Sequence, residues 1–150
     1  MKLKIAWIGK TKEPAIQALT EDYLKRISRY VQVEGIVLRD QAALLEICGR
    51  VATTKGAAKA TLVLMDSRGK EFSSEQFAKF IGDYQDRNPL PLVLAVGDAD
   101  GFSDLSRAAA QHMISLGQMT LAHELARVVL LEQVYRAFTI LKGHPYHCGH

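Results

Sequence analysis

The side chains best suited to chemistry near neutral pH gather in the last third of the chain. All five histidines lie at or after position 112, and histidine is the side chain whose ordinary pKa lies nearest neutrality. A loop of small residues at 115–123 contains one of them, and His144-Pro145-Tyr146-His147 contains two more. We therefore expect proton transfer or ligand binding in this part of the chain.

Residues 144–150 permit more than one interpretation. They contain three histidines and a cysteine, which are metal-ligand types, but their spacing matches no usual zinc pattern, so we expect no metal. An ordered tail is the second interpretation, in which Pro145 and Tyr146 anchor on the surface while the histidines donate to RNA or to a substrate. A frayed terminus is the third.

Alternating strand and helix patterns must position these residues. Continuous apolar runs at 61–65 and 92–96 predict strands buried on both faces, and further strands are expected at 3–8, 31–38 and 113–116. Asp40, Ser73 and Ser103 are predicted N-caps, and helices are expected at about 13–30, 40–51, 73–84, 103–111 and 122–142. The pattern predicts one α/β domain over residues 1–150, a three-layer fold in which a parallel sheet has helices on both faces.

Three loops are expected at the carboxyl ends of the strands, where such sheets bind ligands. They are residues 66–69, 97–101 and 117–120. None has a phosphate-binding glycine motif, and Asp98 and Asp100 would repel phosphate. A ligand with ribose hydroxyls and a sulfonium or amine suits these loops better. For the two aspartates, turn and ligand roles are equally favoured at this point.

The last expected helix, 122–142, is apolar almost all round, so it must be covered on more than one side. Its own sheet covers one side, and a second subunit is the natural cover for the other, which predicts a symmetric homodimer. The local pattern around Arg127 favours a snorkelling side chain. Two interpretations remain for Glu132, Gln133 and Arg136: they are polar positions in a dimer interface, or they have a catalytic role.

Composition indicates an ordinary soluble protein. The net charge of +3 permits a polyanionic partner without requiring one. Two cysteines form no disulfide framework, which favours a reducing cytoplasm. Residues 1–9 are too short an apolar run for a signal peptide, and no stretch has the roughly 18 apolar residues of a membrane span. We expect a cytoplasmic protein with no membrane partner.

Three C-terminal motifs belong together: Ser-Leu-Gly-Gln-Met-Thr-Leu-Ala-His at 115–123, Arg-Val-Val-Leu-Leu-Glu-Gln-Val-Tyr-Arg-Ala at 127–137, and His-Pro-Tyr-His at 144–147. In this combination the chain resembles the RlmH family of SPOUT-class methyltransferases, over essentially its whole length. Three places depart from the family pattern, one of them Glu124, which follows His123 where proline or glutamine is common. Ala99 stands in a loop that usually carries proline, and Cys148 stands where lysine or arginine usually follows the last motif.

The resemblance implies a C-terminal trefoil knot, a homodimer, and S-adenosylmethionine bound by the knotted loops. General topology rules would not predict such a knot. The implied reaction is methylation of N3 of a pseudouridine in 23S rRNA, within the assembled 70S ribosome or the large subunit. By the family pattern the cofactor contacts fall at Met65, Gly97, Leu116, Gly117, Gln118, Met119, Thr120 and Leu121.

We expect the catalytic residues to be His147, Tyr146 and Arg127. In this hypothesis His147 assists deprotonation of N3 or orients the base, and Tyr146 packs against the base. Arg127 contacts an RNA phosphate or the cofactor carboxylate. The alternatives are a non-catalytic RNA-binding dimer and a SPOUT methyltransferase acting on tRNA. A phosphate-receiving signalling domain is rejected, because residues 7–10 lack the acidic pair that would hold magnesium.

Overall fold

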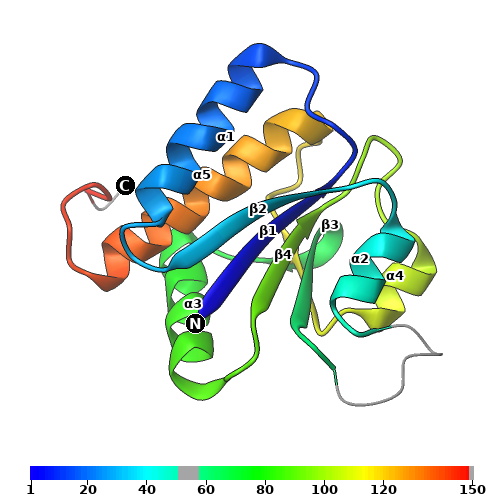
Figure 1. Ribbon diagram of the computed structural model, residues 1–150. Coiled ribbons are helices and arrows are strands. Elements are labelled where there is room, and N and C mark those ends of the chain that lie inside the picture. The colour runs from blue at the N-terminus through cyan, green and yellow to red at the C-terminus, as the bar shows by residue number, and fades with distance from the viewer. Residues whose placement is uncertain (51–57, 149–150) are drawn as a thin grey trace.

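A five-stranded parallel sheet forms the centre of the computed structural model, which describes residues 1–50 and 58–148 (Figure 1). The strand order is β2-β1-β4-β3-β5, and every neighbouring pair is parallel. The strands are β1 (Lys2–Ile8), β2 (Gln32–Leu38), β3 (Thr61–Glu71), β4 (Leu92–Val96) and β5 (His112–Ser115). All of β4 is buried, as the apolar run at 92–96 predicts for a strand covered on both faces.

Helices cover both faces of the sheet, which confirms the predicted three-layer α/β fold (Figure 1). One face carries α1 (Pro14–Ile27), α3 (Ser74–Arg87) and α5 (His123–Leu141). The other carries the shorter α2 (Gln41–Ile47) and α4 (Asp104–Ala109). Each face has its own apolar core, so the sheet is the wall between two cores.

Polar side chains begin three of the helices where the sequence predicts them. Asp40, Ser73 and Ser103 each accept a hydrogen bond from the backbone N–H three residues on, a cap worth about 1 kcal/mol. The side chain of Gln76 in turn accepts a hydrogen bond from the backbone N–H of Ser73, which completes a capping box. The helix after Asp40 ends at Ile47, and residue 51, the end predicted for it, lies outside the described residues.

The last part of β3 runs past the end predicted for it because it pairs with β5 twice. Ile114 of β5 is the partner of both Met65 and Lys70, and residues 66–69 loop out between these two pairings. At Gly69 a Cβ atom would lie 2.4 Å from the carbonyl carbon of Met113, so only glycine fits this crossing. The trefoil knot itself stays a prediction.

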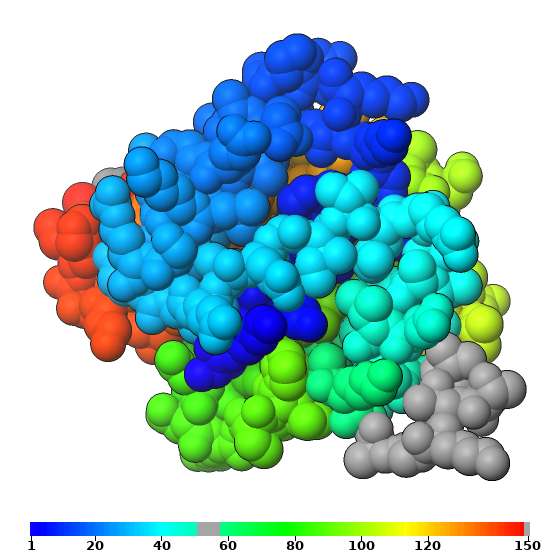
Figure 2. Space-filling view, viewed as in Figure 1, coloured from blue at the N-terminus to red at the C-terminus, as the bar shows by residue number. Residues whose placement is uncertain are grey.

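Helix α5 lies between α1 and α3 on the sheet (Figure 1). Tyr30 of the loop after α1 stacks on Phe138 of α5, with ring centroids 6.0 Å apart, and Gly82 of α3 lies close against Leu141. Only small patches of α5 are visible past α1 in Figure 2. Nine residues of α5 are buried within the one chain, whereas Leu125 and Leu141 stay exposed. The homodimer stays a prediction.

Candidate functional site

Two neighbouring hollows open at the carboxyl edge of the sheet, and Met65 at the end of the first part of β3 lines both. The first contains about 630 Å³ of atom-free space including its mouth, and the second about 530 Å³. This is the place that the general rule for parallel sheets predicts for a ligand.

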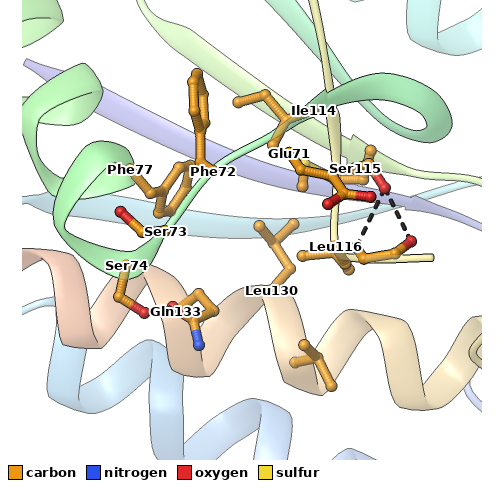
Figure 3. Close-up of a pocket in the computed structure, with 13 residues that line it drawn as sticks. Glu71, Phe72, Ser73, Ser74, Phe77, Ile114, Ser115, Leu116, Leu130 and Gln133 are labelled. Carbon is orange, nitrogen blue, oxygen red and sulfur yellow. Dashed lines mark hydrogen bonds between the residues drawn. The ribbon is translucent and has the colours of Figure 1, made fainter. Parts of the chain in front are cut away.

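The first hollow lies between β5, the start of α3 and the middle of α5 (Figure 3). Its walls combine apolar side chains with a few polar groups. Its lining residues are Met65, Glu71, Phe72, Ser73, Ser74, Phe77, Ile114, Ser115, Leu116, Gly117, Val129, Leu130 and Gln133. The second hollow lies between the ends of β3 and β4 and the start of α5. Its lining residues are Met65, Asp66, Ser67, Val96, Gly97, Asp98, Gly101, Phe102, Arg107, Leu121, His123 and Ala126.

The residues predicted to bind a cofactor divide between the two hollows. Leu116 and Gly117 line the first, and Gly97 and Leu121 line the second. Residues 118–120 line neither and are exposed. The structure thus brings five of the eight predicted residues to two adjoining cavities and leaves the tip of the loop in solvent.

A local turn shapes the loop after β5. The hydroxyl of Ser115 accepts a hydrogen bond from the N–H of Gly117 and donates one to the carbonyl of the same residue (Figure 3). Gly117 has a φ of +131°, which side-chain-bearing residues rarely adopt. The turn therefore depends on glycine and brings backbone groups to the rim of the first hollow.

Charged groups surround the second hollow. Arg107 Nε lies 2.9 Å from Asp66 Oδ2, and this hydrogen bond raises the pKa of the guanidinium. Asp98 Oδ1 accepts from the N–H of Asp100 at 3.0 Å, which is turn chemistry, while Asp98 also lines the hollow. The two roles considered for Asp98 are therefore compatible.

Arg127 lies at the start of α5 and is 1% exposed. Its Nη2 donates to the carbonyl oxygen of Ile8 at 2.8 Å, and its Nη1 donates to the hydroxyl of Thr11 at 3.1 Å. Burial lowers the pKa of the guanidinium below its usual value, although the negative charges of Glu124 and Asp98 act in the other direction. Arg127 lines neither hollow, and it has no hydrogen bond with Tyr146 or His147.

Tyr146 anchors the tail on α5, as the second of the three interpretations expects, while donation by the histidines to RNA or a substrate stays a prediction. The hydroxyl of Tyr146 donates to Glu132 Oε1 at 3.1 Å, and its ring packs edge-on against Tyr135. Burial, and after it the neighbouring Tyr23 and the charge of Glu132, raises the pKa of the Tyr146 hydroxyl. Tyr146 therefore keeps its proton at neutral pH.

Both ring nitrogens of His147 have partners. Nδ1 lies 2.8 Å from Arg136 Nη1, and Nε2 lies 2.8 Å from Glu75 Oε1. The bond to His147 is the main reason that the pKa of Glu75 is lowered. Glu75 was missed in the sequence because its one signal, an acidic residue in the first turn of a helix, equally serves the helix dipole.

A short chain of hydrogen bonds joins the first hollow to this tail. Ser74 Oγ donates to Gln133 Oε1 at 2.9 Å, and Gln133 Nε2 donates to Glu132 Oε2 at 3.2 Å. Glu132 in turn accepts from Tyr146 and Arg136. The tail is therefore joined by hydrogen bonds to Ser74 and Gln133, which line the first hollow together with Leu116 and Gly117 of the loop after β5.

No three histidine, cysteine or acidic side chains gather as a metal site would within residues 1–50 and 58–148. Across the same residues no helix is both long and apolar enough to cross a membrane.

Comparison with known proteins gives matches along nearly the whole chain. The family model described as "Predicted SPOUT methyltransferase" matches residues 1–147. The chain is 52% identical over 150 residues to the Ribosomal RNA large subunit methyltransferase H of Koribacter versatilis (strain Ellin345), with all of both chains covered. It is 43% identical over 155 residues to the protein of the same name in Geobacter sp. (strain M21), with 98% of this chain and 99% of that one covered.

A solved structure supports the fold. The probable methylase family protein from Haemophilus influenzae Rd KW20 superposes with a TM-score of 0.62 at 9% identity, and the match covers 96% of this chain and 69% of that one. At this identity the likeness concerns the arrangement of strands and helices alone.

Proposed function

We propose a specific reaction for this chain, which belongs to the SPOUT methyltransferase family and within it to the RlmH family. In this proposal the chain methylates N3 of a pseudouridine in 23S rRNA of the assembled ribosome. Membership of the family carries the coarser function. The chain is an rRNA methyltransferase that takes its methyl group from S-adenosylmethionine. The position of the methyl group, the ribosomal context, a homodimer and a cytoplasmic location are the further content of the proposal.

The meeting of three loops around Met65 is the observation that carries this proposal. Apolar side chains of Met65, Leu116 and Leu121 suit the adenine ring and the methionine chain. Backbone groups around Gly97 and Gly117 suit the polar edge of adenine and the ribose hydroxyls. The carboxylate of Asp98 at the second hollow suits a cationic ligand and would repel a phosphate.

Bound S-adenosylmethionine supplies an electrophilic methyl group on a positively charged sulfur. The bond from this carbon to N3 of the base forms as its bond to sulfur breaks, and the N3 proton passes to an acceptor. The chain contributes mainly by holding the base in position. Tyr146 keeps its proton and so serves as a packing surface and donor, while His147 orients the base or assists removal of the proton.

Methyl incorporation into ribosomes that lack the modification tests this function. With labelled S-adenosylmethionine we expect one methyl group per 23S rRNA, at N3 of a pseudouridine when the nucleotide is mapped by mass spectrometry. Label in tRNA instead would favour the alternative that the chain is a SPOUT methyltransferase acting on tRNA. Absence of label, together with no heat of S-adenosylmethionine binding in calorimetry, would favour the non-catalytic RNA-binding dimer.

A further inference from the structure

We propose that Glu132 and Arg136 are positioning residues, which together hold Tyr146 and set the tautomer of His147 with the proton on Nε2. The proposal rests on the proposed function in one respect: it takes Tyr146 and His147 to face the reacting base. The assignment of the tautomer rests on the contacts of the described residues alone.

Glu132 gathers the donors. Its Oε1 accepts from Arg136 Nη2 at 2.6 Å, from Arg136 Nε at 3.0 Å and from the Tyr146 hydroxyl at 3.1 Å. Glu132 and Arg136 are four residues apart on α5, so they share one face of the helix. Their side chains are 21% and 22% exposed, and an ion pair that is largely withdrawn from water holds its geometry better than an exposed one.

The rest of the Arg136 guanidinium contacts the tail. Its Nη1 lies 2.8 Å from His147 Nδ1. Its Cζ, the central carbon of the guanidinium, lies 5.0 Å from the centre of the Tyr146 ring, a cation–π distance. One side chain thus contacts both functional residues of the tail while it stays fixed to Glu132. A shift of either helical residue would move Tyr146 and His147 together.

The chemistry of arginine decides the tautomer. A guanidinium has five N–H donors and no acceptor, so the nitrogen facing it must accept. His147 Nδ1 therefore carries the lone pair, and in the neutral ring Nε2 carries the proton. Nε2 donates this proton to Glu75 Oε1 at 2.8 Å, and a carboxylate is the acceptor that it needs.

This arrangement determines what His147 offers to a substrate. The ring is 8% exposed, whereas the side chain of Glu75 is 62% exposed. A carbonyl oxygen of the base that displaces this exposed carboxylate would meet an N–H donor. The lone pair of Nδ1 stays with Arg136, so His147 orients the base through a hydrogen bond instead of taking the N3 proton.

Four proteins test the proposal: the wild type, Arg136→Met, the conservative variant Arg136→Lys and the control Arg26→Met. Arg26 forms an ion pair of the same spacing with Asp22 on α1 and lies over Tyr23 and Tyr135, but its ion pair and ring contacts involve no residue of the tail. Two measurements are made on each. Nitrogen chemical shifts of ¹⁵N-labelled histidine report the tautomer of His147, and single-turnover methylation of ribosomes lacking the modification reports the chemical step.

In the wild type we expect Nδ1 to be unprotonated and Nε2 protonated. Arg136→Met should give a mixture of tautomers and a methylation rate lower by about 100-fold, the order of loss that a small misplacement causes, with the affinity for S-adenosylmethionine unchanged. Arg136→Lys should recover part of the rate, since one ammonium group cannot serve Glu132 and His147 together. Arg26→Met should match the wild type in both measurements.

Two results would overturn the proposal: a protonated Nδ1 in the wild type, or a wild-type methylation rate in Arg136→Met. The wild-type spectrum tests the tautomer even where Arg136→Met does not fold. Failure of the proposed function looks different, because the wild type would then transfer no methyl group to 23S rRNA while its histidine spectrum still showed the tautomer.

Discussion

The two ends of α5 use the same kind of side chain for opposite purposes. At the amino end Arg127 is buried and donates to the carbonyl of Ile8 and the hydroxyl of Thr11, so it ties the helix to the end of β1 and to the loop that follows. At the carboxyl end Arg136 is partly exposed and holds His147. The difference teaches that the partner of a charged side chain, more than its type or spacing, decides whether it serves the fold or the site.

The largest expected effect belongs to the carboxyl end. His147→Ala should lower the rate of ribosome methylation by at least about 100-fold, because the base loses the hydrogen bond that holds it in position. Calorimetry should give an unchanged affinity for S-adenosylmethionine, and the urea midpoint should move little. Unaltered turnover on purified ribosomes would remove His147 from the site.

A substitution at the amino end of α5 should lower the stability of the fold and leave the methylation rate nearly unchanged. Arg127→Met leaves the carbonyl of Ile8 and the hydroxyl of Thr11 without their donor, so we expect a loss of about 1–3 kcal/mol in the free energy of unfolding. Trp7, whose ring lies 5.9 Å from the Arg127 guanidinium, reports unfolding in urea by its fluorescence. The methylation rate per folded molecule should stay near that of the wild type.

Arg127 was expected among the catalytic residues, and this variant tests that expectation too. A rate that falls while the urea midpoint stays constant would contradict the comparison of the two ends and would favour the catalytic role.

The smallest expected effect concerns Glu124, beside Arg127. Its Oε1 accepts from the N–H groups of Lys12 and Glu13, and these bonds lower the pKa of the carboxyl from its usual value of 4.5. A group whose pKa is lowered by folding stabilises the fold above its unfolded pKa, and this contribution is lost as the pH falls through the folded pKa.

Melting temperatures of the wild type and Glu124→Gln should therefore differ at about pH 7, and the difference should shrink as the pH falls below the usual carboxyl pKa of 4.5. A difference that does not depend on pH would mean that the carboxylate charge contributes nothing to this end of α5.

Periodicity and end signals were sufficient to predict the fold, because they report local burial. The apolar run at 92–96 and the caps at Asp40, Ser73 and Ser103 are confirmed. The double pairing of Ile114 with β3 could not be predicted, since it is a contact between distant segments that leaves no periodic trace. The apolar surface of α5 was predicted, and α1 and α3 cover part of it, while the predicted cover by a second subunit stays a prediction.

The candidate site also has one part that could be predicted from the sequence and one part that could not. The loop after β5 was found through its motif, and Met65, Gly97, Leu116, Gly117 and Leu121 do line the two hollows. The contacts of Arg127 could not be predicted, because a position four residues from a neighbour reveals the face of a helix and not what lies opposite. Glu75 is tied to His147 across 72 positions of sequence, and nothing local indicates such a pair.

The placement of α5 between α1 and α3 also bears on how a newly made chain folds. Until residues 123–141 have been synthesised, α1 and α3 lack the helix that separates them, and the groove between them exposes apolar side chains of the larger core. The same residues carry the contacts that order the tail. Acquisition of the native core and of the candidate site should thus coincide late in synthesis, and partly made chains would be clients for chaperones before they could be enzymes.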